Sequence, residues 1–491
     1  MRANVYNSGM RLLSGCVRAS AAVMLVSVSL VPVVAQAPRA KGIEGNWEGT
    51  IDAGAMKLRM GLHLTRNSEG LLIAKLDSID QGVNGIPVPK ATFEGQTLKL
   101  DLANMRASYE GALSASGNEI NGMFLQGGKV PLNFKRVDQV TTIERKQTPK
   151  PPFPYESVDV SYENKRGGVR LGGTLTIPKG AGPHPAVILI TGSGAQDRDE
   201  TIFGHKPFLV LADMLTRRGF AALRLDDRGV GKTTGSLDKS TIEDLAGDVL
   251  AGIEFLKSRS EIDAKQIGLM GHSEGGIIGP LVASKSKDVA FLVMLAGTGV
   301  PIEQILYLQA ELISRASGVP EVMIAQNRRV QSSMFAVVKE ESDPAKAAEK
   351  LRAGWAEMKA SLPEAAQKDA AMSDQNRDQQ ISMINSPGMR FLLVHDPAKV
   401  LKLVSCPVLV INGELDLQVP PHQNLPPIVA ALAEGKNSDF TIVKIPHLNH
   451  LLQTSRTGSV SEYGSNEETI APAALDVIST WLTRHAQLPK N

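Results

Sequence analysis

Two patterns of hydrophobic residues divide the chain near residue 157. Before it, between residues 38 and 137, short segments alternate apolar and polar positions, as in residues 58–64 and 97–102. Turn signals separate these segments about every 8 to 12 residues. Alternation buries one face of a strand and leaves the other in water, so this region is predicted to be a small antiparallel β-barrel or sandwich.

Beyond residue 157, continuous apolar runs alternate with segments of helical period. Such runs are typical of strands that are buried on both faces of a parallel sheet. Between two of them, residues 240–243 form a capping-box pattern, and an apolar stripe follows it as far as Leu256. The alternation predicts βαβ units and an α/β fold. The runs are residues 186–190, 221–225, 267–270, 291–295 and 407–411.

Two segments interrupt these patterns. A proline-rich run at 149–154 marks a stiff linker between the two regions. Residues 301–400 are rich in Ala, Met, Glu, Lys and Gln and predict several helices, either as a cap above the sheet or packed beside the core. The predicted organisation is a signal peptide (1–37), a small β domain (38–137), a linker (138–156), the first part of the α/β core (157–300), a helical cap insertion (301–400) and the second part of the core (401–491).

The first 37 residues have the features of a secretory signal peptide. Arg2, Arg11 and Arg18 precede an uncharged, mostly apolar run at 19–34, and residues 35–37 give an A-x-A cleavage signal. The alternative is an uncleaved membrane anchor, but the run is short for a span and contains serines and a proline. We therefore expect export to the periplasm or the medium and no membrane span after cleavage.

Charge and ligand patterns exclude several functions. Lysine and arginine total 53 against 51 aspartates and glutamates, so the net charge of +2 gives no electrostatic footprint for nucleic acid. No HExxH or paired CxxC pattern occurs, so neither a catalytic metal nor another cofactor is expected. No pattern points to an oligomeric state.

The turn at residues 227–233 ends like a phosphate-binding loop. Asp226 stands where that motif needs glycine, so phosphate binding is not expected. A rigid turn that holds Arg228 near the functional site is the better interpretation. The charged run at 196–200 is either part of a salt-bridged rim or a solvated loop.

One motif has the spacing of a nucleophile. Gly271, Ser273 and Gly275 match G-x-S-x-G between the apolar run 267–270 and a helical segment at 277–283. The motif alone is weak, but a nucleophile elbow requires this strand–turn–helix setting, because the strained turn exposes the serine hydroxyl. Ser273 is therefore the predicted nucleophile, with the following helix N-terminus facing the developing oxyanion.

A serine nucleophile needs a base, and the base needs a carboxylate. In chains with this elbow the acid follows a late strand. Asp416 is the predicted acid and Glu414 the alternative, since both follow the apolar run at 407–411.

The base is expected in the loop after the last strand, at residues 440–445. His450 or His447 fits that position. His422 lies too close to Asp416 in sequence, and His485 falls in the terminal helix.

The oxyanion hole is predicted from small residues behind the first long buried run. Gly192, Ser193 and Gly194 would let main-chain N–H groups approach a substrate oxygen. The N–H groups of Ser193 and Glu274 are the expected donors, with Gly192 and Gly194 in support. The alternative is a plain strand-to-loop turn.

Five ordered segments together resemble the bacterial EstD-like carboxylesterases of the α/β-hydrolase superfamily, often labelled serine aminopeptidase or prolyl-oligopeptidase-like. The resemblance covers residues 155–487 and implies an α/β-hydrolase fold with Ser273, Asp416 and His450 as the triad. It favours His450 over His447 because the Asn-His-Leu-x-Gln context surrounds it. Ala195 departs from the proline common in relatives. The segments are residues 192–199, 227–231, 271–276, 412–420 and 449–453.

The sequence thus predicts a carboxylesterase that acts on small-molecule esters. Aromatic residues make up only 4% of the chain, which favours small to medium acyl groups. One alternative is a peptidase with the same triad, for which Glu274 offers a carboxylate. Another is a surface- or carbohydrate-binding protein with secondary hydrolase activity, although the β domain lacks a clear row of exposed aromatic residues, with Trp47 and Tyr109 standing apart.

Overall fold

The computed structural model describes residues 42–52, 57–105, 107–126, 128–362, 364–367, 372–486 and 488. The predicted signal peptide lies outside them. Among the helices of the described ranges, none is both long and apolar enough to cross a membrane.

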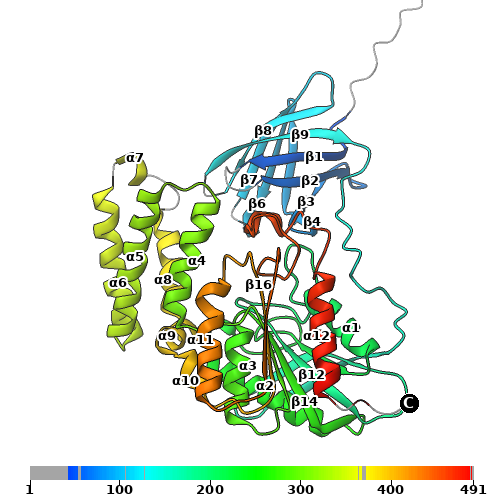
Figure 1. The fold of residues 1–491 in the computed structure, drawn as a ribbon. Coiled ribbons are helices and arrows are strands. Elements are labelled where there is room, and N and C mark those ends of the chain that lie inside the picture. Colours follow the sequence, from blue (N-terminus) through cyan, green and yellow to red (C-terminus); the bar gives the residue numbers. More distant parts are fainter. Residues whose placement is uncertain are drawn as a thin grey trace, which may run out of the picture. The chain divides into compact units, whose positions relative to one another are not determined.

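The strands of the N-terminal region form a nine-stranded antiparallel sheet that curls into a nearly closed barrel (Figure 1). The predicted alternation is visible in β6, where Leu98, Leu100 and Leu102 are buried and the residues between them are not. The prediction of an antiparallel barrel or sandwich is confirmed as a barrel. The order is β4-β3-β2-β1-β9-β8-β7-β6-β5. The strands are β1 (Gly45–Asp52), β2 (Lys57–Arg66), β3 (Leu72–Ser78), β4 (Val83–Val88), β5 (Lys90–Glu94), β6 (Thr97–Leu102), β7 (Ala107–Leu113), β8 (Glu119–Leu125) and β9 (Lys129–Val137).

The second region is built on an eight-stranded sheet in the order β10-β11-β13-β12-β14-β15-β16-β17. The predicted apolar runs form β13, β12, β14, β15 and β16, which pair in parallel, and β17 extends this parallel part. Two strands before them, β10 and β11, pair in antiparallel fashion, which the sequence did not indicate. The strands are β10 (Glu156–Asn164), β11 (Val169–Ile177), β12 (His184–Ile190), β13 (Ala221–Leu225), β14 (Ile262–His272), β15 (Leu292–Leu295), β16 (Val408–Gly413) and β17 (Phe440–Ile445).

Helices cover both faces of this sheet, and each face has its own apolar core. α1 (Pro207–Arg217) and α12 (Pro472–His485) pack on one face. α2 (Ile242–Lys257), α3 (Gly275–Lys285) and α11 (Pro421–Glu434) pack on the other. These layers are the α/β-hydrolase fold expected from the sequence.

The start of α2 differs from the prediction by one residue. Thr241 is the N-cap, and its side chain accepts a hydrogen bond from the N–H of Asp244. The carboxylate of Asp244 accepts from the N–H of Thr241 in return, which completes the capping box. The sequence pattern at 240–243 correctly predicted a capping box, but the motif is formed by Thr241 and Asp244, one position later.

The chain between β15 and β16 forms the inserted helices. They enclose a small core of their own, which includes Tyr307, Phe335, Leu351 and Ile381. The last one, α10, returns to the α/β core, where Leu401 is buried. The insertion consists of α4 (Ile302–Ala316), α5 (Glu321–Glu340), α6 (Pro344–Ser361), α7 (Glu364–Gln367), α8 (Asp374–Ile384), α9 (Pro387–Val394) and α10 (Pro397–Leu401).

Candidate active site

The turn between β14 and α3 holds Ser273 in a left-handed backbone conformation, with φ of +53°. This conformation is unfavourable for a residue with a side chain and occurs mainly at functional turns. A Cβ at Gly271 would overlap the carbonyl oxygen of Gly275, and one at Gly275 would overlap that of Ile190. The turn can therefore close only with glycine at both positions.

Three side chains from separate strand ends meet at this turn. The Oγ of Ser273 lies 3.1 Å from Nε2 of His450. Nδ1 of the same ring lies 2.8 Å from Oδ2 of Asp416. Asp416 follows β16 and His450 follows β17, and the carboxyl ends of parallel strands open at one edge of a sheet. The topology thus brings Ser273 together with Asp416 and His450, each of which is more than a hundred positions away from it in sequence.

The carboxylate of Asp416 is fully buried and holds the imidazole in one orientation. Its Oδ1 accepts the N–H groups of Gln418 and Val419, each at 2.8 Å, and its Oδ2 accepts from Nδ2 of Asn412 at 2.9 Å. Because an ionised carboxylate only accepts, Nδ1 of His450 must carry the proton. Nε2 is then free to accept the proton of Ser273 Oγ.

The other candidates for acid and base lie elsewhere. Glu414 is exposed and pairs with Lys444 at 3.5 Å. His447 and His422 are exposed, and His485 stacks on Trp481 in α12. Among the acids and histidines considered, only Asp416 and His450 form a chain of hydrogen bonds to Ser273.

The main-chain N–H groups of Ser193 and Glu274 suit an oxyanion hole. Neither donates to an acceptor in the described part of the chain, and both residues line the same cavity as Ser273. Gly194 also lines it, with φ of +94° in the turn. Gly192 differs, because its N–H donates to Oε1 of Glu200 at 2.7 Å and is not available to a substrate.

The carboxyl group of Glu274 is perturbed by its surroundings. Burial and the nearby Asp227 raise its pKa to about 7. Burial likewise raises the pKa of Asp227 to about 6, against hydrogen bonds from Gln196 and Thr191 that lower it. A carboxyl group that is part protonated at neutral pH therefore lies beside the nucleophile.

The side chain of Arg228 is held by an ion pair and hydrogen bonds to other residues of the chain. Its Nε lies 2.6 Å from Oδ2 of Asp248, and its terminal nitrogens donate to Oδ1 of Asp248, the hydroxyl of Ser240 and the carbonyl of Asp244. Both partners of this ion pair are largely buried. Arg228 thus fixes the turn after β13 against α2.

Replacement of Arg228 by methionine is expected to destabilise the protein by about 3 to 5 kcal/mol, because it leaves the charge of Asp248 buried without its partner. Urea denaturation followed by circular dichroism measures this loss. Lys257→Met breaks two surface pairs, with Asp288 and Glu254, and serves as the control. Equal, small losses in both variants would show that the buried pair has no special role.

The charged run at 196–200 is not a solvated loop. Arg198 lies 2.6 Å from Asp226, and Asp199 pairs with Arg224. Glu200 is buried and lies 2.9 Å from Nδ1 of His272. The sequence predicts no role for His272, because this residue occupies a variable position of the G-x-S-x-G motif.

A cavity of about 1200 Å³ opens above Ser273. Core residues near the nucleophile form its floor, and the inserted helices provide most of its apolar walls. Tyr307, Phe335, Trp355, Met334, Met389 and Leu392 are among these wall residues.

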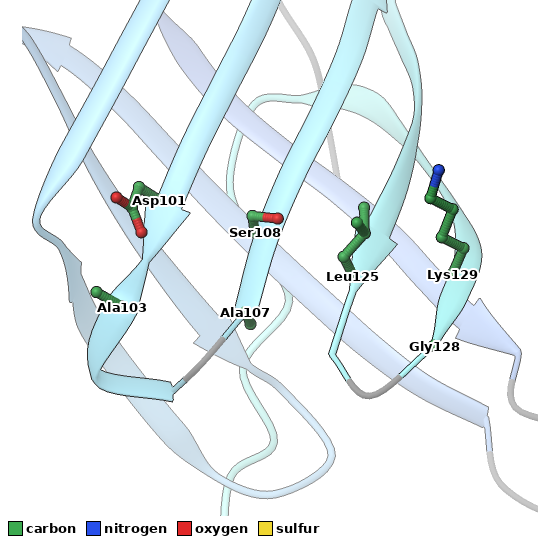
Figure 2. Close-up of a pocket in the computed structure, with 7 residues that line it drawn as sticks. All are labelled: Asp101, Ala103, Ala107, Ser108, Leu125, Gly128 and Lys129. Atoms are coloured by element: carbon green, nitrogen blue, oxygen red, sulfur yellow. The ribbon is translucent and has the colours of Figure 1, made fainter. Parts of the chain in front are cut away.

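A second hollow, of about 460 Å³, lies on the barrel. Figure 2 shows Asp101 and Lys129 on opposite sides of it, with Ser108 between them. Its lining contains no histidine, and no hydrogen bond joins Ser108 to Asp101 or Lys129 among the described residues, so no base is positioned to activate Ser108. The large cavity is the better candidate for a substrate site.

Comparison with known proteins agrees with this assignment of the fold. Residues 206–456 match the family model described as serine aminopeptidase, S33. The chain is 35% identical to esterase EstD of Thermotoga maritima over 181 residues, which are 35% of this chain and 40% of that relative. The match thus spans two fifths of the length of this curated protein.

Similar solved structures are more distant. A hypothetical protein from Pseudomonas aeruginosa is 16% identical, with a TM-score of 0.42 and coverage of 71% of this chain and 99% of that one. An esterase from Pyrococcus furiosus is 15% identical, with a TM-score of 0.40 and coverage of 71% and 96%.

Proposed function

The chain belongs to the serine aminopeptidase S33 family, and we propose that it is a carboxylesterase that works through an acyl-enzyme on Ser273. The observation that carries the proposal is the continuous chain of hydrogen bonds from Ser273 through His450 to the buried Asp416. The similarity to an esterase over part of its length supports the same activity.

In the proposed reaction, Oγ of Ser273 attacks the ester carbonyl while Nε2 of His450 takes its proton. Asp416 stabilises the imidazolium that forms. The N–H groups of Ser193 and Glu274 bind the oxyanion, each contributing about 3 to 4 kcal/mol. His450 then protonates the leaving alcohol, and a water molecule activated by the same ring releases the acid.

The proposed substrates are small-molecule esters with small to medium acyl groups. The cavity of about 1200 Å³ exceeds what such an acyl group fills, so we infer that the alcohol part also lies within it. Its mostly apolar wall favours a hydrophobic substrate.

Two alternative functions were predicted from the sequence, a peptidase and a surface- or carbohydrate-binding protein. For a peptidase, Glu274 lines the cavity and would pair with a substrate amine through its carboxylate, although burial raises its pKa and disfavours that charged form. Against a binding module, Trp47 and Tyr109 are buried in the barrel core and present no surface for stacking on a sugar.

Paired substrates test the activity. A series of p-nitrophenyl esters of increasing chain length should be hydrolysed, with the highest kcat/KM at small to medium length. The p-nitroanilide of the best acyl group should react at least about a hundredfold more slowly, because an amine is a poorer leaving group. Faster cleavage of the anilide, or of an aminoacyl anilide, would favour the peptidase.

Export remains a proposal that rests on the pattern at residues 1–37. It is supported by the uncharged run and the A-x-A signal. N-terminal sequencing of the protein from a periplasmic fraction would test it, and a mature chain that begins at Met1 would contradict it.

A further inference from the structure

A buried ion pair lies directly behind the catalytic residues. Nδ1 of His272 is 2.9 Å from Oε1 of Glu200, and its Nε2 is 3.0 Å from the carbonyl oxygen of His450. Both side chains are at most one tenth exposed. The proposed mechanism uses neither of them.

The partners of His272 define its protonation state. When Glu200 is ionised, both ring nitrogens face an oxygen that only accepts, whereas a neutral imidazole can donate through one nitrogen alone. The ring is therefore satisfied only as an imidazolium. The charge of Glu200 supports this state, as does the more remote Asp416, against the effect of burial. The ring of His450 packs beside the ring of His272, with 4.9 Å between the two ring centroids. Asp227 is the charged group that faces Glu200.

The Glu200–His272 pair connects the oxyanion loop to the main chain of the general base. Among the contacts described above, no other side chain connects these two parts of the site. Glu200 accepts the N–H of Gly192, the residue before the oxyanion donor Ser193. His272 holds the main chain of His450, the general base. Glu200 itself adopts a left-handed conformation, with φ of +52°, so its position is maintained at a cost in backbone strain.

We propose that Glu200 and protonated His272 are positioning residues that fix the oxyanion loop relative to the general base, and that loss of the His272 proton limits catalysis on the alkaline side. This inference rests on the proposed esterase function. Without the proton, either Glu200 or the carbonyl of His450 loses its donor, and the two loops are no longer held together.

The sign of the pH effect follows from the direction of the shift. The pair raises the pKa of His272 to about 9. The proton is present at lower pH and is lost as the pH rises through that value, so activity should fall there. Glu200→Gln removes the opposing charge while His272 stays buried, so the pKa of His272 should fall. The alkaline limb of the pH–activity profile should then move to lower pH by roughly two units.

The experiment is a pH profile of kcat and KM for the wild type, Glu200→Gln and His422→Gln, corrected for spontaneous ester hydrolysis. The alkaline limb should shift in Glu200→Gln, mainly through kcat, since Glu200 does not line the cavity. His422 is exposed on α11, so its variant should follow the wild type. An unchanged limb in Glu200→Gln would overturn the inference.

NMR of the wild type labelled with ¹⁵N-histidine provides a readout that does not depend on how a variant folds. One histidine should keep both ring nitrogens protonated above neutral pH and titrate near 9. If every histidine is already neutral between pH 7 and 9, the proposed positioning role of protonated His272 is wrong. Failure of the proposed esterase function is a different result: the anilide would then be cleaved faster than the ester, or ester hydrolysis would survive loss of the Ser273 hydroxyl.

Discussion

Ser273→Ala is expected to reduce kcat for ester hydrolysis by roughly 10⁴-fold or more, to the level that the oxyanion hole and binding supply alone. In the proposed mechanism Oγ of Ser273 forms the acyl-enzyme, and no other hydroxyl in the turn replaces it. KM should change little, because the apolar wall of the cavity is intact. Steady-state kinetics on the best p-nitrophenyl ester measures the loss.

A matched variant separates chemistry from folding. Ser284 lies in α3, the helix that follows Ser273, and its hydroxyl donates to the carbonyl of Leu281. Ser284→Ala should keep nearly full activity and the same circular dichroism spectrum as Ser273→Ala. A fluorophosphonate probe should label the wild type and Ser284→Ala but not Ser273→Ala. Activity that survives in Ser273→Ala would exclude this serine as the nucleophile.

Much of the α/β fold could be predicted because its central strands are apolar on both faces. The run in β12 is buried at every position, and so is that in β16. β10 carries mostly exposed residues at the edge of the sheet, so its sequence shows no such run. Its antiparallel pairing with β11 depends on contacts that local patterns do not encode.

The site shows the same division between local and long-range information. Ser273 is marked by a local strand–turn–helix pattern, and the expected positions after the last two strands narrow the choice of acid and base. The roles of Glu200 and His272 were not visible, since these residues are 72 positions apart and His272 contacts a carbonyl 178 positions away. Only the folded chain shows that the N–H of Gly192 is already occupied.

Asp416→Asn is expected to lower kcat by about 10⁴-fold, because it changes the tautomer of His450. Four donors converge on the carboxylate of Asp416. The single carbonyl oxygen of asparagine can remain with the two main-chain N–H groups only if its NH₂ faces Nδ1 of His450. That nitrogen must then accept, so the proton moves to Nε2, which can no longer take the proton of Ser273 Oγ.

Glu414→Gln is the control for Asp416→Asn, since Glu414 follows the same strand but is exposed and pairs only weakly with Lys444. It should leave kcat within about twofold, as expected for a surface ion pair. The reverse pattern, with activity lost in Glu414→Gln and kept in Asp416→Asn, would assign the acid to Glu414. If both variants were active, His450 would be oriented by its other contacts, and the carbonyl of His450 held by His272 would be the first of these to test.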